Sequence, residues 1–153
     1  MVSNSSFCRL QEKYIVVTGG TNRDFIDALC SAGRYDCQND MWEQIASLNE
    51  ARMDHSSCSI GDSVYIFDGD SEVNHQIEKL DKVTGPVKET SKHWQSIKIG
   101  ITIDCKKIVT AVLNSQEIII FGAIKDKVLI LNSKTNRIDV EEDKDKNIYC
   151  YPS

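Results

Sequence analysis

Three apolar runs in this sequence end in a pair of small residues, and the spacing of these pairs limits the folds open to the chain. The pairs are Gly19-Gly20, Asp68-Gly69 and Gly122-Ala123, whose first members lie 49 and 54 residues apart. A second pair of residues, separated by seven positions, occurs twice, as Tyr35 with Trp42 and as Leu131 with Ile138. A period in this range indicates repeated structural units that stack to bury their apolar faces. The repeat therefore predicts an architecture before any chemistry.

The segments around these pairs predict short antiparallel β-strands. Val64 to Phe67, Ile118 to Phe121 and Val128 to Leu131 are rich in β-branched and aromatic residues and are bounded by turn-forming residues. The third repeat is the clearest, because tight turns at Asn114-Ser115 and Lys125-Asp126 join its strands into a meander. Further strands are expected at 6–10, 14–18, 53–60 and 108–113. Helical spacing occurs at 24–32, inside an expected loop, so the fold class is all-β.

Together these residues resemble the kelch repeat, which has an Arg, a strand, an apolar-Tyr strand ending in Gly-Gly, and then a Tyr followed seven positions later by a Trp. The second repeat matches best, with Arg52 sixteen residues before Asp68 and with Tyr65 and Gly69 in place. The first repeat supplies Gly19, Gly20, Tyr35 and Trp42. The third is degenerate, with Lys106, Gly122-Ala123, Leu131 and Ile138 at the corresponding positions.

The second repeat departs from the pattern at two places. Asp68 replaces a Gly, and seven extra residues lie between Leu80 and Trp94. Because Val87 stands at the regular spacing, the sequence leaves both Val87 and Trp94 as candidates for the Trp position of this repeat.

The resemblance implies kelch-type β-propeller blades, about three four-stranded antiparallel meanders forming an incomplete ring. The expected repeats cover 3–51, 52–105 and 106–140, and a charged link and tail covers 141–153. Propellers close with typically four to eight blades, so three repeats leave two open faces. Either further blades belong to a longer product, or the array stays open, or two chains self-associate to complete a six-bladed ring.

Charge and hydropathy exclude several classes of partner. The net charge of -5 argues against a phosphate backbone, so we expect no nucleic acid partner. No apolar stretch approaches the ~20 residues that span a bilayer, and the first ten residues do not resemble an export signal. We therefore expect no membrane partner and a cytoplasmic or nuclear location. In such a compartment the six cysteines are expected to be free thiols, including Cys30 and Cys37, for which a regulatory disulfide is the alternative.

The candidate binding surface lies in the loops between the second and third strands of each blade. In the first repeat this loop is long (21–34), in the second intermediate (71–76) and in the third minimal (123–126). Length variation on a regular scaffold is typical of binding specificity. The candidate partner-binding residues are Arg23, Asp24, Phe25, Asp27 and Arg34. A solvated loop with Phe25 packed against the blade is the alternative.

The sequence offers no recognisable catalytic or metal-binding set. No nucleophile, base and orienting group follow from spacing, and no Gly-rich phosphate loop precedes a helix. His55 and Cys58 lie three apart in an expected strand and so point to opposite faces. Asp68, Asp70 and Glu72 do not match a calcium loop, and read as a solvated acidic turn.

The leading hypothesis is therefore a protein-protein interaction module or adaptor, without cofactor or catalysis, that binds a protein partner through blade loops. The resemblance also allows a propeller enzyme such as an oxidase or a sugar epimerase. A fragment of a longer kelch protein without independent function is the third alternative.

Overall fold

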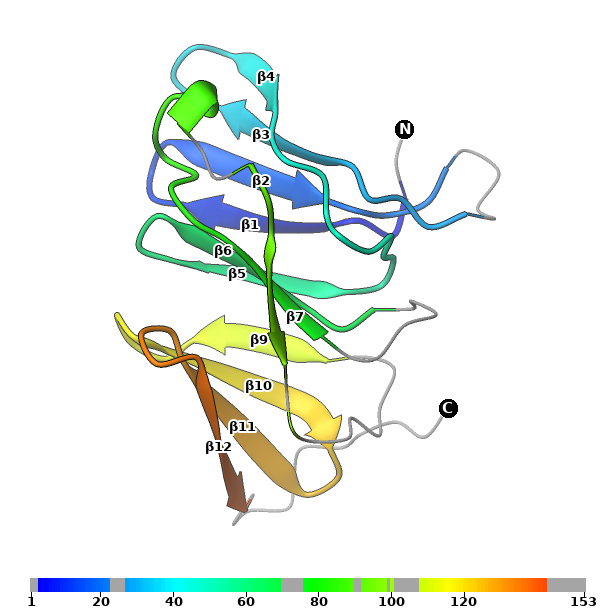
Figure 1. Ribbon diagram of the computed structural model, residues 1–153, viewed down its shortest axis with the longest axis vertical. Helices are drawn as coiled ribbons and strands as arrows, with labels where there is room; N and C mark the ends of the chain where they lie inside the picture. The colour runs from blue at the N-terminus through cyan, green and yellow to red at the C-terminus, as the bar shows by residue number, and fades with distance from the viewer. Residues whose placement is uncertain are drawn as a thin grey trace.

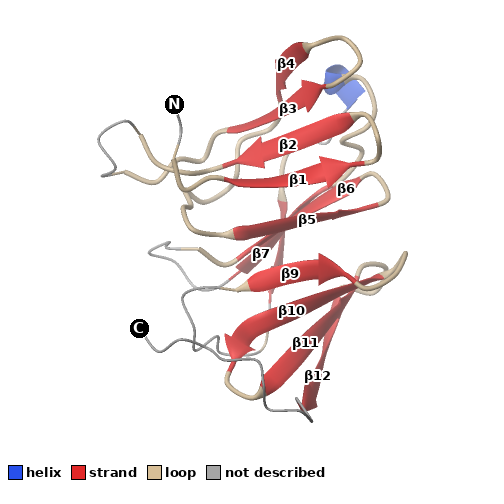
Figure 2. Cartoon of the chain, turned by 180° about the vertical axis from the view of Figure 1, so that it is seen from behind, coloured by secondary structure: helices blue, strands red, loops and turns tan. Residues whose placement is uncertain are grey.

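The computed structural model describes residues 3–22, 27–69, 76–89, 92–98, 100 and 108–142. They form three four-stranded antiparallel sheets and one short 3-10 helix, as Figures 1 and 2 show. Within each sheet the strands pair in chain order, which is the up-and-down meander of a propeller blade. The expectation of an all-β fold built of blade-like sheets is confirmed.

The strands of the three blades have the following bounds. Blade 1 contains β1 (Ser6–Leu10), β2 (Tyr14–Thr18), β3 (Ala32–Asp36) and β4 (Met41–Gln44). Blade 2 contains β5 (Ser56–Ile60), β6 (Ser63–Phe67), β7 (Gln76–Leu80) and β8 (Gln95–Lys98), with helix η1 (Val87–Glu89) between its last two strands. Blade 3 contains β9 (Val109–Val112), β10 (Glu117–Ile124), β11 (Lys127–Asn132) and β12 (Arg137–Glu142).

The first strands of the blades lie next to one another, so the three sheets fan out from β1, β5 and β9 (Figure 1). Turns between the first and second strands lie at one end of the blades, and the described part of the loop between β2 and β3 lies at the other, together with the link between blades 1 and 2.

Two apolar clusters hold adjacent blades together. Because side chains alternate across a strand, each blade has an upstream face toward the preceding blade and a downstream face toward the following one. Tyr14 and Val16 on the downstream face of blade 1 share a cluster with Val64 and Ile66 on the upstream face of blade 2. The downstream face of blade 2 and the upstream face of blade 3 form the second cluster, whose members include Tyr65, Phe67, Ile118, Ile120, Leu129 and Leu131.

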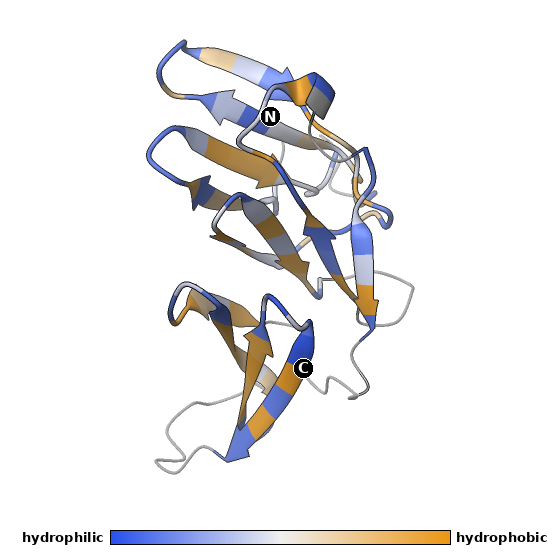
Figure 3. Ribbon diagram, turned by 60° about the vertical axis from the view of Figure 1, so that its left-hand side comes forward, coloured by the Kyte–Doolittle hydropathy of each residue, from blue (hydrophilic) through white to orange (hydrophobic). Residues whose placement is uncertain are grey.

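The distribution of hydropathy explains why these strands stack rather than stand alone. Figure 3 shows apolar colour on part of most strands, alternating with polar colour along some of them, and polar colour at most of the turns. In β6 all five residues are buried, because blade 2 has a neighbour on both sides. A strand buried on both faces reads as a continuous apolar run, which is what Val64 to Phe67 shows in the sequence.

The observed strand bounds refine several expectations. The second repeat starts its first strand at Ser56 rather than at residue 53, and β10 extends beyond Phe121 to Ile124 through an irregular register after Ile120. β12 runs to Glu142, so the first two residues of the expected tail belong to a strand. The described part of segment 24–32 contains no helix, and Ala32 begins β3.

Candidate functional site

The base of the long loop between β2 and β3 is fixed by backbone hydrogen bonds to the link between blades 1 and 2. The amide of Leu29 donates to the carbonyl of Gly20, at 2.8 Å. Arg52 pairs with the same segment, since its amide donates to the Leu29 carbonyl at 3.0 Å and its carbonyl accepts from Gly20 at 2.8 Å. The loop therefore leaves the blade from a fixed base rather than from a free strand end.

Asn22 and Asp27 are hydrogen-bonded to each other in the described part of this loop. The amide nitrogen Nδ2 of Asn22 donates to Oδ2 of Asp27 at 3.0 Å, and the two backbones are also hydrogen-bonded. Asp27 is exposed. Arg23, Asp24 and Phe25 lie outside the described residues, so partner contact by this group stays a prediction.

Arg34 does not lie in the loop, which corrects the expected extent of that segment. It stands in the middle of β3, and its side chain is buried on the downstream face of blade 1. Its guanidinium carbon lies 4.5 Å from the centre of the Tyr14 ring, Nε donates to Glu43 at 2.8 Å, and Nη1 donates to the carbonyls of Val83 and Gly85. Since Arg34 holds the β7–β8 connection of blade 2 against blade 1, we exclude it from the candidate binding surface.

Arg52, at the Arg position of the repeat, forms a buried ion pair. Its Nε donates to Oε1 of Glu78 at 3.0 Å, and its Nη1 donates to the carbonyl of Asp68 at 2.7 Å. The other carboxylate oxygen of Glu78 accepts the backbone amide of Asn49 at 2.7 Å. This cluster ties the link between blades 1 and 2 to β7, and both charged side chains are fully buried.

The glycine positions of the repeat are explained by close backbone approach. A Cβ at Gly19 would stand 2.4 Å from the carbonyl oxygen of Arg52, and one at Gly69 would stand 2.8 Å from the carbonyl oxygen of Met53. Both residues also have positive φ, which glycine adopts most readily. Asp68 occupies the place of Gly19 with φ 53°, a conformation that Asp tolerates better than most residues. Gly122, the third copy, has φ 80°.

His55 lies next to Gly19 and Gly69 and is buried. Its Nε2 is 2.9 Å from the hydroxyl oxygen of Thr18. Burial, together with the nearby Arg52 charge, lowers the pKa of His55 from 6.5 to about 4. The imidazole is therefore neutral at physiological pH and serves packing between blades 1 and 2.

Trp94 occupies the Trp position of the second repeat, which the sequence left open between Trp94 and Val87. In blade 1 Tyr35 pairs with Trp42, and in blade 2 Lys79 pairs with Gln95. Extending that register by one residue sets Trp94 opposite Leu80, as Trp42 stands opposite Tyr35. Val87 lies in η1, inside the inserted segment.

The two tryptophans differ in burial. Trp94 is 4% exposed, packs in the cluster between blades 1 and 2, and donates Nε1–H to the Ala46 carbonyl at 2.8 Å. Trp42 is 63% exposed. Of the two tryptophans, only Trp94 lies between neighbouring sheets of the described chain. Trp42 lies on the upstream face of the first blade, against which the described chain places no other blade.

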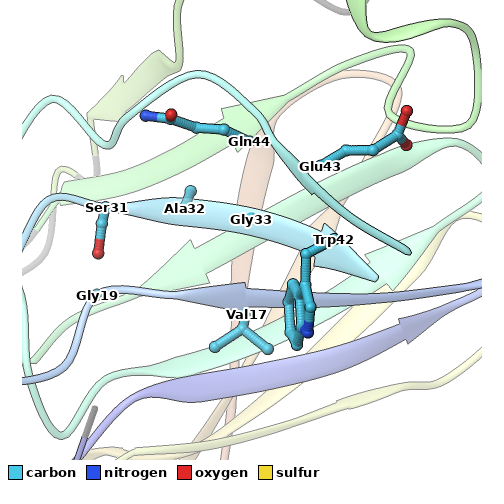
Figure 4. A pocket seen from close by; sticks show the side chains of 8 residues that line it. All are labelled: Val17, Gly19, Ser31, Ala32, Gly33, Trp42, Glu43 and Gln44. Carbon is cyan, nitrogen blue, oxygen red and sulfur yellow. The ribbon is translucent and has the colours of Figure 1, made fainter. Parts of the chain in front are cut away.

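Trp42 borders a shallow hollow on the same face. The hollow measures about 330 Å³ and is lined by Val17, Gly19, Ser31, Ala32, Gly33, Trp42, Glu43 and Gln44 (Figure 4). In Figure 4 the indole of Trp42 and the side chain of Val17 lie close together beside Gly33. Glu78 is the residue of blade 2 that corresponds to Gly33. Val17 pairs with Gly33 in blade 1, and Ile66, which corresponds to Val17, pairs with Glu78 in blade 2. A glycine at this position thus leaves open the space above β3.

The cysteines of the described chain are free thiols. Cys30 and Cys37 are exposed, whereas Cys8 and Cys58 are buried. Burial raises the pKa of Cys8 and of Cys58 to about 12. Among residues 3–22, 27–69, 76–89, 92–98, 100 and 108–142, no three His, Cys, Asp or Glu side chains gather as metal ligands would. Asp70 and Glu72 fall outside these ranges. The described part of the chain also contains no helix long and apolar enough to span a membrane.

Comparison with known proteins gives one partial likeness. A stretch of 47 residues is 38% identical to Kelch-like protein 36 of Bos taurus, and the match covers 31% of this chain and 8% of that protein. No protein-family profile matches the chain. The similarity to a kelch-like protein agrees with the blade-like sheets and with the repeat signature described above.

Proposed function

We propose that this chain is a non-catalytic kelch-type module that binds a protein partner in the cytoplasm or nucleus. The observation that carries the proposal is the contrast between a regular scaffold and one irregular loop. Three blades with equivalent registers hold the β2–β3 loop of blade 1 on a hydrogen-bonded base, while the corresponding β10–β11 connection of blade 3 has only two residues between its strands. The partial likeness to Kelch-like protein 36 supports the same class of protein.

The contact residues we propose are Arg23, Asp24, Phe25 and Asp27. This group combines both signs of charge with one aromatic ring, a composition that suits recognition of a protein surface. The ring would supply apolar contact area, and the flanking charges would set orientation. An acidic chain with net charge -5 favours a partner surface of basic or mixed charge.

The experiment compares proteins recovered with the wild-type chain and with a variant that carries Arg23→Ala, Asp24→Ala and Phe25→Ala. The matched control carries Glu12→Ala, Gln38→Ala and Lys134→Ala, which are exposed residues in turns at the opposite end of the blades. A partner should be lost with the loop variant, retained by the control, and bind the purified wild-type chain in calorimetry. Equal recovery by all three proteins would contradict the proposal.

A further inference from the structure

The upstream face of blade 1 has the composition of an internal junction but lacks a neighbour within the described chain. Its apolar residues are Phe7, Ile15, Val17, Tyr35 and Trp42, and the same face also carries Arg9, Gly33 and Gln44. Ile15 corresponds to Val64 in blade 2 and to Ile118 in blade 3, because each lies four positions before the first residue of the small pair in its repeat. Val64 and Ile118 are fully buried against the preceding blade, whereas Ile15 is partly exposed. The same contrast separates Trp42 from Trp94.

Blade 3 has the complementary open surface, its downstream face. Ile119 and Phe121 of β10 point to the side opposite Ile118 and Ile120, which are buried against blade 2. Val109 pairs with Phe121, and Ile130 pairs with Ile119, so these four side chains share the open face. The equivalents of Ile119 and Phe121 in blade 2 are Tyr65 and Phe67, which are buried under blade 3.

One pair of positions shows how the first strands meet at each internal junction. Between blades 1 and 2 the hydroxyl oxygens of Ser6 and Ser57 are 2.7 Å apart. Between blades 2 and 3 the hydroxyl oxygens of Ser56 and Thr110 are 2.8 Å apart. In both cases the first residue lies on a downstream face and the second on the next upstream face, and both residues are polar.

The strand registers identify the same two positions on the open faces. In each blade the residue just before the small pair has one partner on the first strand. This partner is Ser6 in blade 1, Ser56 in blade 2 and Val109 in blade 3, so Val109 holds the downstream position in blade 3. Phe7 pairs with Val17 as Ser57 pairs with Ile66, so Phe7 holds the upstream position in blade 1. Both residues are apolar, and both are strongly exposed, Phe7 at 73% and Val109 at 65%. At each internal junction these two positions both carry a hydroxyl group, whereas on the two open faces they both carry an apolar side chain.

We propose that the downstream face of blade 3 binds the upstream face of blade 1 of a second copy of this chain, with Val109 against Phe7. Joined at both ends, two chains form a closed ring of six blades, which lies within the range that propellers adopt. The junction is heterologous, and the ring closes because the second chain uses the same two faces in the same order. A dimer formed through two upstream faces would instead leave both copies of Val109, Ile119 and Phe121 in water. The proposal does not depend on partner binding by the loops.

The test measures molar mass by sedimentation over a range of concentrations. The wild-type chain is expected to form a species of twice 17.2 kDa. Phe7→Lys and Val109→Glu are each expected to weaken the dimer about tenfold or more, because each places an unpaired charge in an apolar contact. When the two variants are mixed, the new lysine of one chain faces the new glutamate of the other, and the remaining junction is native. The mixture should regain the dimer that each variant alone forms only weakly.

Val140→Glu is the matched control. Val140 is an exposed valine of the same sheet, but it pairs with Leu129 and lies on the face of blade 3 toward blade 2, so this variant should dimerise as the wild type does. Circular dichroism and thermal melting of each variant check that it is folded. A wild-type chain that remains a monomer would overturn the proposal and leave these faces to other blades. A dimer that Phe7→Lys leaves intact, or a mixture that does not recover, would overturn it as well.

Discussion

Trp94 and Trp42 hold the same position in successive blades, and replacing each by alanine should have very different effects on stability. Trp94→Ala removes an indole that packs between blades 1 and 2 and deletes its hydrogen bond to the Ala46 carbonyl. A substitution of this kind in a core costs about 3–5 kcal/mol, from the lost apolar burial and the cavity that is left. Trp42→Ala removes a mostly exposed ring, and in the monomer it should change stability by less than about 1 kcal/mol.

These costs are large relative to the total free energy of unfolding, which is about 5–15 kcal/mol for a domain. At about 2–4 °C per kcal/mol for a chain of this size, Trp94→Ala should lower the melting temperature by roughly 10 °C. Urea unfolding followed by circular dichroism gives the comparison, because it does not rely on the fluorescence of the residue removed. The measurement belongs at a low protein concentration, where association adds nothing to stability.

Two outcomes would refute this reasoning. If Trp42→Ala costs as much as Trp94→Ala at low concentration, then Trp42 is buried within the single chain. If Trp94→Ala costs less than about 1 kcal/mol, then the junction between blades 1 and 2 is not a packed core. At high concentration the cost of Trp42→Ala should grow if the upstream face of blade 1 is covered by a second copy, since that variant then also weakens the dimer.

Three further predictions concern buried charges and thiols. Arg52→Leu or Glu78→Leu alone should cost about 3–5 kcal/mol in urea unfolding, because each strands a buried charge, and the double variant should cost less than the sum; additive costs would exclude coupling. The pKa of His55 is about 4 in the folded state and 6.5 in the unfolded state, so the unfolded state binds the proton first as pH falls. Up to about 3 kcal/mol of stability is therefore lost as pH falls from the unfolded pKa through the folded one. In His55→Gln this part of the pH dependence should disappear, and an unchanged pH profile would contradict the assignment. Iodoacetamide should modify Cys30 and Cys37 in the folded chain much faster than Cys8 and Cys58, as peptide mass spectrometry would show; equal rates would contradict their burial.

The sequence predicted the architecture because the turn residues and the apolar runs are local signals. Gly19 and Gly69 stand where positive φ and close backbone approach leave little room for a side chain, so the repeat is visible in the chain itself. The apolar run before Asp68 predicted β6 for the same reason. These features depend on a few neighbouring residues and can be read without knowledge of the fold.

Burial of particular residues was harder to predict, because it depends on which blade lies next to which. Arg34 has the side chain of a surface residue, and it is buried because the inserted segment of blade 2 supplies the carbonyls of Val83 and Gly85. The sequence showed the insertion but not where it packs. Trp42 has the side chain of a core residue, and it is exposed because the described chain supplies no blade before the first. The contacts that bury Arg34 come from a segment distant in sequence, and the described chain supplies no comparable segment for Trp42.

The same position on the third strand takes a different residue in each blade, and the differences follow from the neighbours. Glu78 is compatible with burial in blade 2 because Arg52 and the amide of Asn49 come from the preceding link. At the equivalent position of blade 3, Leu129 belongs to the apolar cluster with blade 2 and needs no polar partner. In blade 1 the position is Gly33, which leaves a hollow rather than a buried charge. A charged residue at the position of Gly33 would need polar partners from a link preceding blade 1, and the described chain does not provide such a link.

Stacked repeats that end in water normally carry polar outer faces on their terminal units, because an apolar terminal face would associate or aggregate. The outer faces of blades 1 and 3 do not meet that condition. Phe7, Ile15 and Trp42 on one side, and Val109 and Phe121 on the other, are the residue types found at the internal junctions. Phe7, Trp42 and Val109 are largely exposed even though polar residues such as Arg9 and Asp139 lie on the same faces. The two faces therefore do not resemble caps, and the paired charge variants at Phe7 and Val109 decide whether a second copy covers them.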